Sequence, residues 1–138
     1  MKQLLSIAAF ILVSNLCVAQ AVPNSGSIMA AAYKKAAKEN KNVFVMFHAS
    51  CCGWCKKMDA SMNDVTTKKY FDDNYVTVHL TVQENPENKN LENKGPNVFL
   101  AKSKCETAGL PLFLIMDKKG TKAEGIFLNR ENTASPAP

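Results

Sequence analysis

Residues 48–55 read HASCCGWC and place three cysteines, Cys51, Cys52 and Cys55, within five positions. Cys52 and Cys55 make a C-x-x-C pair, whereas Cys51 and Cys55 make a C-x-x-x-C pair. Closely spaced cysteines can serve as a redox dithiol, as metal ligands or as a structural disulfide. The sequence on either side of the cluster narrows these alternatives.

The cluster lies between a predicted strand and a predicted helix. Residues 42–48, NVFVMFH, form a short apolar run rich in Val and Phe, which is typical of a buried central strand. Residues 53–62, GWCKKMDASM, have a helix-compatible composition, with Met58 and Met62 four positions apart. The cysteines are therefore expected on a strand-to-helix turn at the carboxyl end of a strand, where open α/β sheets place their sites.

This position favours reactive chemistry at one cysteine in particular. Free N–H groups and the partial positive charge at a helix start stabilise a thiolate, and Cys52 occupies that place. Cys55 follows one helical turn later on the same face, within reach of a disulfide. A purely structural disulfide is the alternative, but so small a loop adds little stability. We therefore predict that Cys52 is the attacking nucleophile and Cys55 the partner with which it forms a reversible disulfide.

The remaining sequence alternates between helical and extended patterns. The expected elements are a helix capped by Ser27 and running over 28–41, a helical segment 66–74, a strand 75–82, a surface loop 83–97 without chemistry, a helix 98–109, a strand 110–117, a turn 117–120 and a strand 121–129. Strands separated by helices indicate parallel pairing, and the closing hairpin adds an antiparallel edge. The prediction is an α/β fold with a central mixed sheet and helices on both faces.

The amino-terminal segment resembles an export signal. Residues 1–21 combine Lys2, an apolar run from Leu4 to about Val18, and small residues at Ala19 and Ala21, which is the layout of a secretory signal peptide. The alternative is a membrane anchor, but the run is shorter than the roughly 20 residues of a spanning helix. We expect an exported protein, periplasmic or extracellular after signal removal and without a stable membrane anchor, in a compartment where disulfides persist.

Length and charge complete the domain organisation. The chain has 138 residues, 46% of them hydrophobic, which suits one domain over 27–128 after a leader at 22–26. The segment 129–138 is polar and rich in proline, and a disordered tail is expected there. The formal net charge is +5, but the lysines are scattered and no aromatic pattern accompanies them. Nucleic acid is therefore not an expected partner.

The cluster and a downstream motif together resemble a known family. The stretch FVMFHASCCGWCKKM, followed by GLPLFLIMDKKG, is similar to the thioredoxin superfamily, and within it to exported thioredoxin-like proteins with a Cys-Gly-Trp-Cys active site. The likeness covers roughly residues 27–128. It implies a thioredoxin-like fold in which Pro111 is the cis-proline facing the dithiol and Leu110 offers a backbone edge to substrate. Trp54, between the two cysteines, is expected to contact substrate.

The chain also departs from the family pattern. Cys51 stands where the family usually has tryptophan, and Met46 stands where thioredoxin has a buried aspartate that assists the resolving cysteine. Deprotonation of Cys55 is then expected to depend on water, on His48 or His79, or on a group that the sequence does not reveal. The last helix of the family also has no counterpart in NRENTASPAP, which predicts a partly uncovered sheet face.

Three further residues have open roles. Cys51 is expected as a half-buried thiol in the tryptophan position, or else as a competitor that changes the redox outcome. Cys105 is expected as a buried small hydrophobe, with a second redox pair with Cys51 or a metal ligand as alternatives. His48, four positions before Cys52, is close enough to tune it.

These residues predict an exported thiol–disulfide oxidoreductase that exchanges disulfides with protein substrates, as a reductant or isomerase supplied by a membrane electron donor. No cofactor and no metal ligands are assigned. One alternative is a copper-binding or copper-delivery protein of the same fold, because Cys51 and Cys55 recreate the C-x-x-x-C spacing and soft thiolates suit Cu(I). A non-catalytic binding module that uses an open sheet face is the other.

Overall fold

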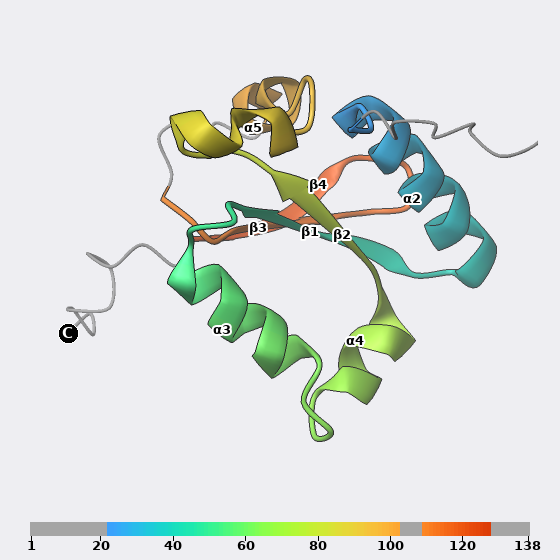
Figure 1. The fold of residues 1–138 in the computed structure, drawn as a ribbon. Coiled ribbons are helices and arrows are strands. Elements are labelled where there is room, and N and C mark those ends of the chain that lie inside the picture. The colour runs from blue at the N-terminus through green and yellow to red at the C-terminus, as the bar shows by residue number, and fades with distance from the viewer. Residues whose placement is uncertain (1–21, 103–108, 128–138) are drawn as a thin grey trace, which may run out of the picture.

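The computed structural model describes residues 22–102 and 109–127, and Figure 1 shows the arrangement of their helices and strands. Along the chain these are helix α2 (Ser25–Glu39), strand β1 (Asn42–His48), helix α3 (Gly53–Met62), helix α4 (Lys68–Asn74), strand β2 (Tyr75–Thr81), the 3-10 helix η2 (Pro86–Leu91), helix α5 (Asn97–Lys102), strand β3 (Leu112–Met116) and strand β4 (Lys122–Phe127). The predicted signal peptide 1–21, Cys105 and the predicted tail 129–138 lie outside the described residues. Within the described ranges, no helix is both long and apolar enough to cross a membrane.

The strands form one mixed sheet in the order β2-β1-β3-β4, which confirms the predicted α/β class. β1 pairs with β2 in parallel and with β3 antiparallel, and β3 forms the expected antiparallel hairpin with β4. The prediction that strands separated by helices pair in parallel is therefore wrong for β3. The connection from β2 to β3 begins beside His48 and ends beside Phe47, so it starts and finishes at the carboxyl end of β1. Because the chain does not return to the amino end of β1 before β3 begins, β3 runs antiparallel to β1.

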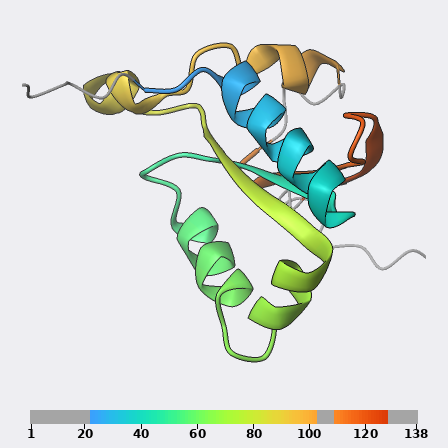
Figure 2. The same ribbon diagram turned by 90° about the vertical axis from the view of Figure 1, so that its right-hand side faces the viewer.

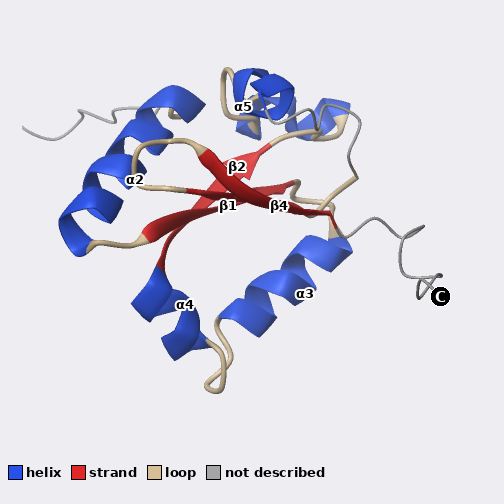
Figure 3. Cartoon of the chain, turned by 180° about the vertical axis from the view of Figure 1, so that it is seen from behind, coloured by secondary structure: helices blue, strands red, loops and turns tan. Residues whose placement is uncertain are grey.

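Helices cover both faces of this sheet, as Figures 1 and 3 show, with α2 and α5 on one face and α3 and α4 on the other. The strand period of two sends alternate side chains of β1 to opposite faces. The core under α2 and α5 is formed by buried residues of the helices and three strands, namely Met29, Ala32, Ala36, Val43, Val45, Phe47, Val76, Val78, Leu80, Val82, Leu100, Leu112, Leu114 and Met116. The smaller core under α3 and α4 contains Phe44, Met46, Cys55, Met62 and Phe113.

The start of α2 differs from the sequence prediction. The helix is capped by Asn24, whose side chain accepts a hydrogen bond from the Gly26 N–H at 2.7 Å, and not by Ser27. Asn is as good an N-cap as Ser, and the Ser25 N–H is already bound to the Lys94 carbonyl at 2.9 Å. Much of the predicted leader 22–26 therefore belongs to the first turn of the helix.

The segment after β2 is also more than a surface loop. It contains η2, and its residues Glu84 and Asn93 are buried. Asn93 caps the end of β2, because its side-chain oxygen accepts from Thr81 N–H at 2.7 Å and its own N–H donates to the Thr81 carbonyl at 3.0 Å. Its side-chain amide also donates to the Pro23 carbonyl at 3.0 Å, and Figure 2 shows the start of α2 beside this segment. The connection is thus held at the edge where β1 ends.

Candidate active site

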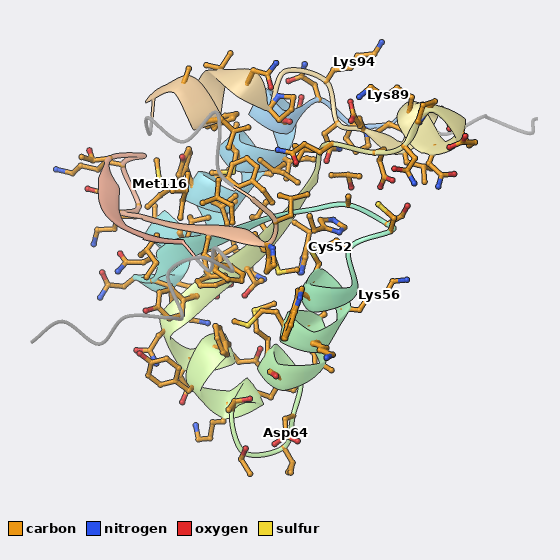
Figure 4. The ribbon with its side chains drawn as sticks, turned by 90° about the vertical axis from the view of Figure 1, so that its left-hand side faces the viewer. Cys52, Lys56, Asp64, Lys89, Lys94 and Met116 are labelled. Carbon is orange, nitrogen blue, oxygen red and sulfur yellow. A yellow bond between two sulfur atoms is a disulfide. The ribbon has the colours of Figure 1, made fainter. Side chains whose placement is uncertain are left out.

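Cys52 and Cys55 form a disulfide at the start of α3, visible as the sulfur–sulfur bond beside the Cys52 label in Figure 4. Their sulfurs are 2.00 Å apart and their Cα atoms 5.2 Å apart. Cys52 is the N-cap of α3, and the Cys55 N–H donates to Cys52 Sγ at 3.1 Å. In the reduced protein this N–H and the helix start would stabilise a thiolate on Cys52.

The two sulfurs differ in access to solvent. Cys52 is half-buried, whereas Cys55 is only 2% exposed and packs in the core under α3. An attacking thiolate must reach its partner disulfide, while a resolving thiol needs only to reach its neighbour. The burial is therefore consistent with Cys52 as the attacking sulfur and Cys55 as the resolving one.

The antiparallel course of β3 brings the Leu110–Pro111 segment to the same edge of the sheet. The Leu110–Pro111 peptide bond is cis, and Leu112 pairs with Phe47, just before the turn that carries the cysteines. Leu110 is half-buried and packs against the cluster that contains Cys55 and Cys52. Segments about 55 residues apart in the chain thus border one site.

Cys51 is exposed, and it is the free thiol of the described part of the chain. The expectation of a half-buried thiol in the tryptophan position is therefore wrong. The turn before α3 points Cys51 Sγ toward the segment after β2, 3.9 Å from Asn85 Oδ1. The alternative, in which Cys51 changes the redox outcome, stays a prediction, and a pairing of Cys51 with Cys105 lies outside the described residues.

Two histidines and an aspartate lie on the α3 side of the sheet. The rings of His48 and His79 meet edge to face with centroids 5.5 Å apart, and His79 Nε2 is 2.7 Å from Asp59 Oδ1 on α3. His48 Nε2 is 3.3 Å from Thr81 Oγ1. Burial is the main reason that the pKa of His48 is lowered, and the neighbouring His79 acts in the same direction. His48 is therefore mainly neutral near pH 7.

Trp54, between the two cysteines, is 63% exposed. The Lys57 ammonium lies 4.4 Å from the centroid of its ring, which is a cation–π contact. Trp54 thus presents its ring at the protein surface, in a position where a bound partner can reach it.

The sequence analysis missed Glu84. Glu84 is 5% exposed, and its carboxylate accepts from the Ser50 N–H and the Ser50 hydroxyl, each at 2.6 Å. The Glu84 N–H in turn donates to Glu92 Oε1 at 2.8 Å, and Lys89 is 2.7 Å from the same oxygen. The usable signal is an acid three residues after a strand that ends beside the cysteine turn. The contact anchors the cysteine turn from the segment after β2, so the prediction of a surface loop without a role there is wrong for Glu84.

In the described ranges 22–102 and 109–127, no group of three or more His, Cys, Asp or Glu residues is placed so that it could hold a metal ion. Cys55 is bonded to Cys52 and not to Cys51. The C-x-x-C pair is therefore the one formed in this structure.

An α/β sheet of this order, with a C-x-x-C disulfide at a helix start and a cis-proline loop beside it, defines the thioredoxin-like class of proteins. The model of the thioredoxin-like domain family matches residues 29–133, and the chain belongs to that family. No curated protein sequence matches the chain significantly.

Solved structures give the same fold at low sequence identity. A disulphide isomerase from Xylella fastidiosa Temecula1 is 16% identical with a TM-score of 0.59, over 81% of this chain and 77% of that one. A DsbH oxidoreductase is 17% identical with a TM-score of 0.54, over 86% and 82%. The oxidised DsbD C-terminal domain of Neisseria meningitidis is 18% identical with a TM-score of 0.51, over 76% and 84%. At these identities the likeness establishes the fold.

Proposed function

We propose that this protein is an exported thiol–disulfide oxidoreductase that acts on protein substrates through Cys52 and Cys55. The observation that carries the proposal is the disulfide itself, between an accessible N-cap sulfur and a buried partner beside the cis Leu110–Pro111 bond. The names of the structural neighbours, a disulphide isomerase and a DsbH oxidoreductase, support the same chemistry.

The reaction begins from the reduced pair. The Cys52 thiolate attacks one sulfur of a substrate disulfide, that S–S bond breaks, and the released substrate sulfur takes up a proton. Cys55 then loses its proton and attacks Cys52 Sγ in the mixed disulfide, which releases the second substrate sulfur as a thiolate. The substrate disulfide is reduced by two electrons, and the Cys52–Cys55 disulfide is formed. Leu110 offers its backbone to the bound substrate segment.

Proton removal from Cys55 needs an acceptor, because this sulfur is buried and Met46, which packs in the same cluster, cannot take a proton. Asp59 follows Cys55 by one helical turn on α3, so both residues lie on the same side of the helix. Asp59 is also in contact with His79. We assign Asp59 and His79 as the acceptor pair, with His48 packed against His79.

The proposed direction is reduction or isomerisation. Gly53 and Trp54 occupy the positions between the cysteines, and neither is the histidine of strongly oxidising relatives. A reductant in an oxidising compartment must be supplied with electrons, and a membrane electron donor fills that role. Lys2 and the apolar run that follows it support export.

Trapping the mixed disulfide tests the proposal. In the double variant Cys51→Ser/Cys55→Ser, Cys52 can attack a substrate but no neighbouring thiol resolves the product. We expect adducts with envelope proteins on non-reducing gels, identified by mass spectrometry after reduction. The matched variant that also carries Cys52→Ser should give none. A reduced wild-type protein that does not reduce insulin, together with adducts that persist without Cys52, would exclude the catalytic function.

A further inference from the structure

The exposed side of α3 carries a cationic and aromatic surface beside the dithiol. We define this α3 outer surface by the side chains of Trp54, Lys56 and Lys57, all of which are exposed. The Lys57 ammonium lies against the Trp54 ring at 4.4 Å, so the two side chains form one unit. An indole with a cation beside it offers a carboxylate-bearing segment both an apolar contact and a charge partner.

Lys56 is the member of this surface that lies on the same side of the helix as the attacking sulfur. Lys56 follows Cys52 by one helical turn, and the Lys56 N–H donates to the Cys52 carbonyl at 3.3 Å. Residues four apart lie on the same side of a helix. Figure 4 shows Cys52 at the start of α3 and Lys56 extending outward from the helix. The Lys56 side chain therefore leaves the helix on the same side as Cys52, to which a substrate is bonded in the mixed disulfide.

Three carboxylates of α3 and of the segment after β2 are already engaged. Asp59 is in contact with His79, Glu84 accepts two hydrogen bonds from Ser50, and Glu92 is paired with Lys89. The lysines of the α3 outer surface form no ion pair among the described residues. Their charge is therefore available to a bound partner.

One acidic group lies on the opposite border of the site. Glu87 is exposed on η2, two residues after Asn85, which contacts Cys51. The site is thus cationic on its α3 side and carries a carboxylate on its η2 side. A substrate is expected to place its acidic residues toward α3.

We propose that the α3 outer surface selects substrates in which Asp or Glu residues flank the disulfide. This inference rests on the proposed function and names its substrate class, an acidic polypeptide segment. Lys56 and Lys57 attract the substrate carboxylates, and Trp54 packs against the adjacent side chain. The attraction acts mainly on the rate of encounter, so it weakens as salt screens the charges.

Small disulfides of different charge test the surface independently of any natural substrate. The double variant Cys51→Ser/Cys55→Ser leaves Cys52 as the reacting thiol of the site, and Trp54, the single tryptophan of the chain, reports adduct formation by fluorescence. The probes are 3,3′-dithiodipropionate (anionic), bis(2-hydroxyethyl) disulfide (neutral) and cystamine (cationic). Each rate is divided by the rate of the same probe with free 2-mercaptoethanol, which removes the intrinsic reactivity of the probe.

The normalised rate should be about three to ten times higher for the anionic than for the neutral probe at low salt, and lower still for the cationic one. This preference should shrink at 0.5 M salt, where the Debye length falls to roughly 4 Å and charges farther apart are largely screened. Adding Lys56→Gln and Lys57→Gln should reduce the anionic-to-neutral ratio toward one. The control is Lys34→Gln with Lys35→Gln on α2, which removes the same charge from the other face of the sheet and should leave the ratio unchanged.

Equal normalised rates for the three probes would overturn the inference, as would an equal loss of preference in the α2 control. Neither result affects the proposed function, which the adduct and insulin experiments test separately. Conversely, a charge preference of the small probes without any protein adduct would contradict the proposed function, and with it the acidic polypeptide substrate that this inference names. Peptides with a disulfide flanked by Glu, Gln or Lys then extend the probe series to polypeptides, and the same order of rates is expected.

Discussion

The two faces of the sheet are built from the same strands but differ in chemistry. On the face under α2 and α5, the strands contribute apolar side chains, and all of the core members are buried. On the face under α3 and α4, most of β1 and β3 is apolar. The polar half of this face is formed by Thr77, His79 and Thr81 of β2 together with His48 at the end of β1. The same alternation in β2 thus buries Val78 and Leu80 on one side and presents polar groups on the other.

This difference separates stability from chemistry. The dithiol, the His79–Asp59 contact and the lysines of the α3 outer surface all lie with α3. The face under α2 carries most of the buried apolar side chains, and burial of such side chains is the main stabilising term. Substitutions on the two faces should therefore have separable effects on folding and on redox behaviour.

The largest effect on stability should come from the face under α2. Leu114 is 1% exposed in the middle of β3, and Leu114→Ala should lower the free energy of unfolding by about 2–5 kcal/mol through a cavity that refills only in part. The measurement is urea unfolding of the oxidised protein. The redox potential of the folded variant should stay unchanged. A shifted potential would show that the two faces are coupled.

The next largest effect should come from the hydrogen bonds between the Glu84 carboxylate and Ser50 in the turn before Cys52. Glu84→Ala leaves the half-buried Ser50 N–H without its acceptor, which should cost about 1–3 kcal/mol. It should also shift the potential of the Cys52–Cys55 pair, because the turn before Cys52 loses its anchor. Urea unfolding and a glutathione redox titration measure the two effects. Glu87→Ala, exposed on the same loop, is the control and should change neither. A normal potential in Glu84→Ala would reduce Glu84 to a structural role.

Substitution of two glycines should change the free energy of unfolding by smaller amounts and in opposite directions. Gly120 has φ +83°, and an added Cβ would lie 3.2 Å from the Tyr33 ring on α2, so Gly120→Ala should destabilise by about 1–2 kcal/mol. Gly53, the first residue of α3, has open space around an added Cβ, and Gly53→Ala should stabilise by up to about 1 kcal/mol. Thermal unfolding of both variants measures the difference. Stabilisation by Gly120→Ala would contradict the positive φ and the contact with Tyr33.

The predictable part of the fold consists of segments with a clear local pattern. The apolar run of β1, the alternation of β2 and the turn at residues 117–120 each identify an element by composition alone. The direction of β3 is not predictable in this way, because it depends on the end of β1 at which the preceding connection finishes. The position of the α2 cap at Asn24 also depends on a distant segment, because the Lys94 carbonyl accepts a hydrogen bond from the Ser25 N–H.

The same limit applies to the site. Spacing on a helix start was enough to choose Cys52 and Cys55 over the alternative pair with Cys51. The exposure of Cys51 and the contact of Glu84 with Ser50 both depend on how the segment after β2 folds against the cysteine turn. The segment after β2 has no hydrophobic periodicity from which the burial of the Glu84 carboxylate could be predicted. Long-range contacts of polar side chains are thus the part that sequence patterns miss.

The smallest effect concerns the polar half of the α3 face and depends on pH. The pKa of His48 is lowered from 6.5 mainly by burial and next by His79, while Asp59 and Glu84 oppose the shift. The unfolded chain therefore binds a proton at a pH where the folded protein does not. The contribution of His48 to stability is complete above about pH 6.5 and is lost as the pH falls through the lowered value.

Urea unfolding at several pH values between about 5 and 8 measures this contribution, in a range where most carboxylates stay ionised. The wild type should lose stability toward the acidic end, and His48→Gln should show a shallower dependence. Leu114→Ala is the matched control from the opposite face, since it lowers stability but keeps His48 and should keep the slope of the wild type. An equal slope in wild type and His48→Gln would mean that other groups carry the pH dependence, and that the polar half of the α3 face serves the dithiol without a measurable effect on folding.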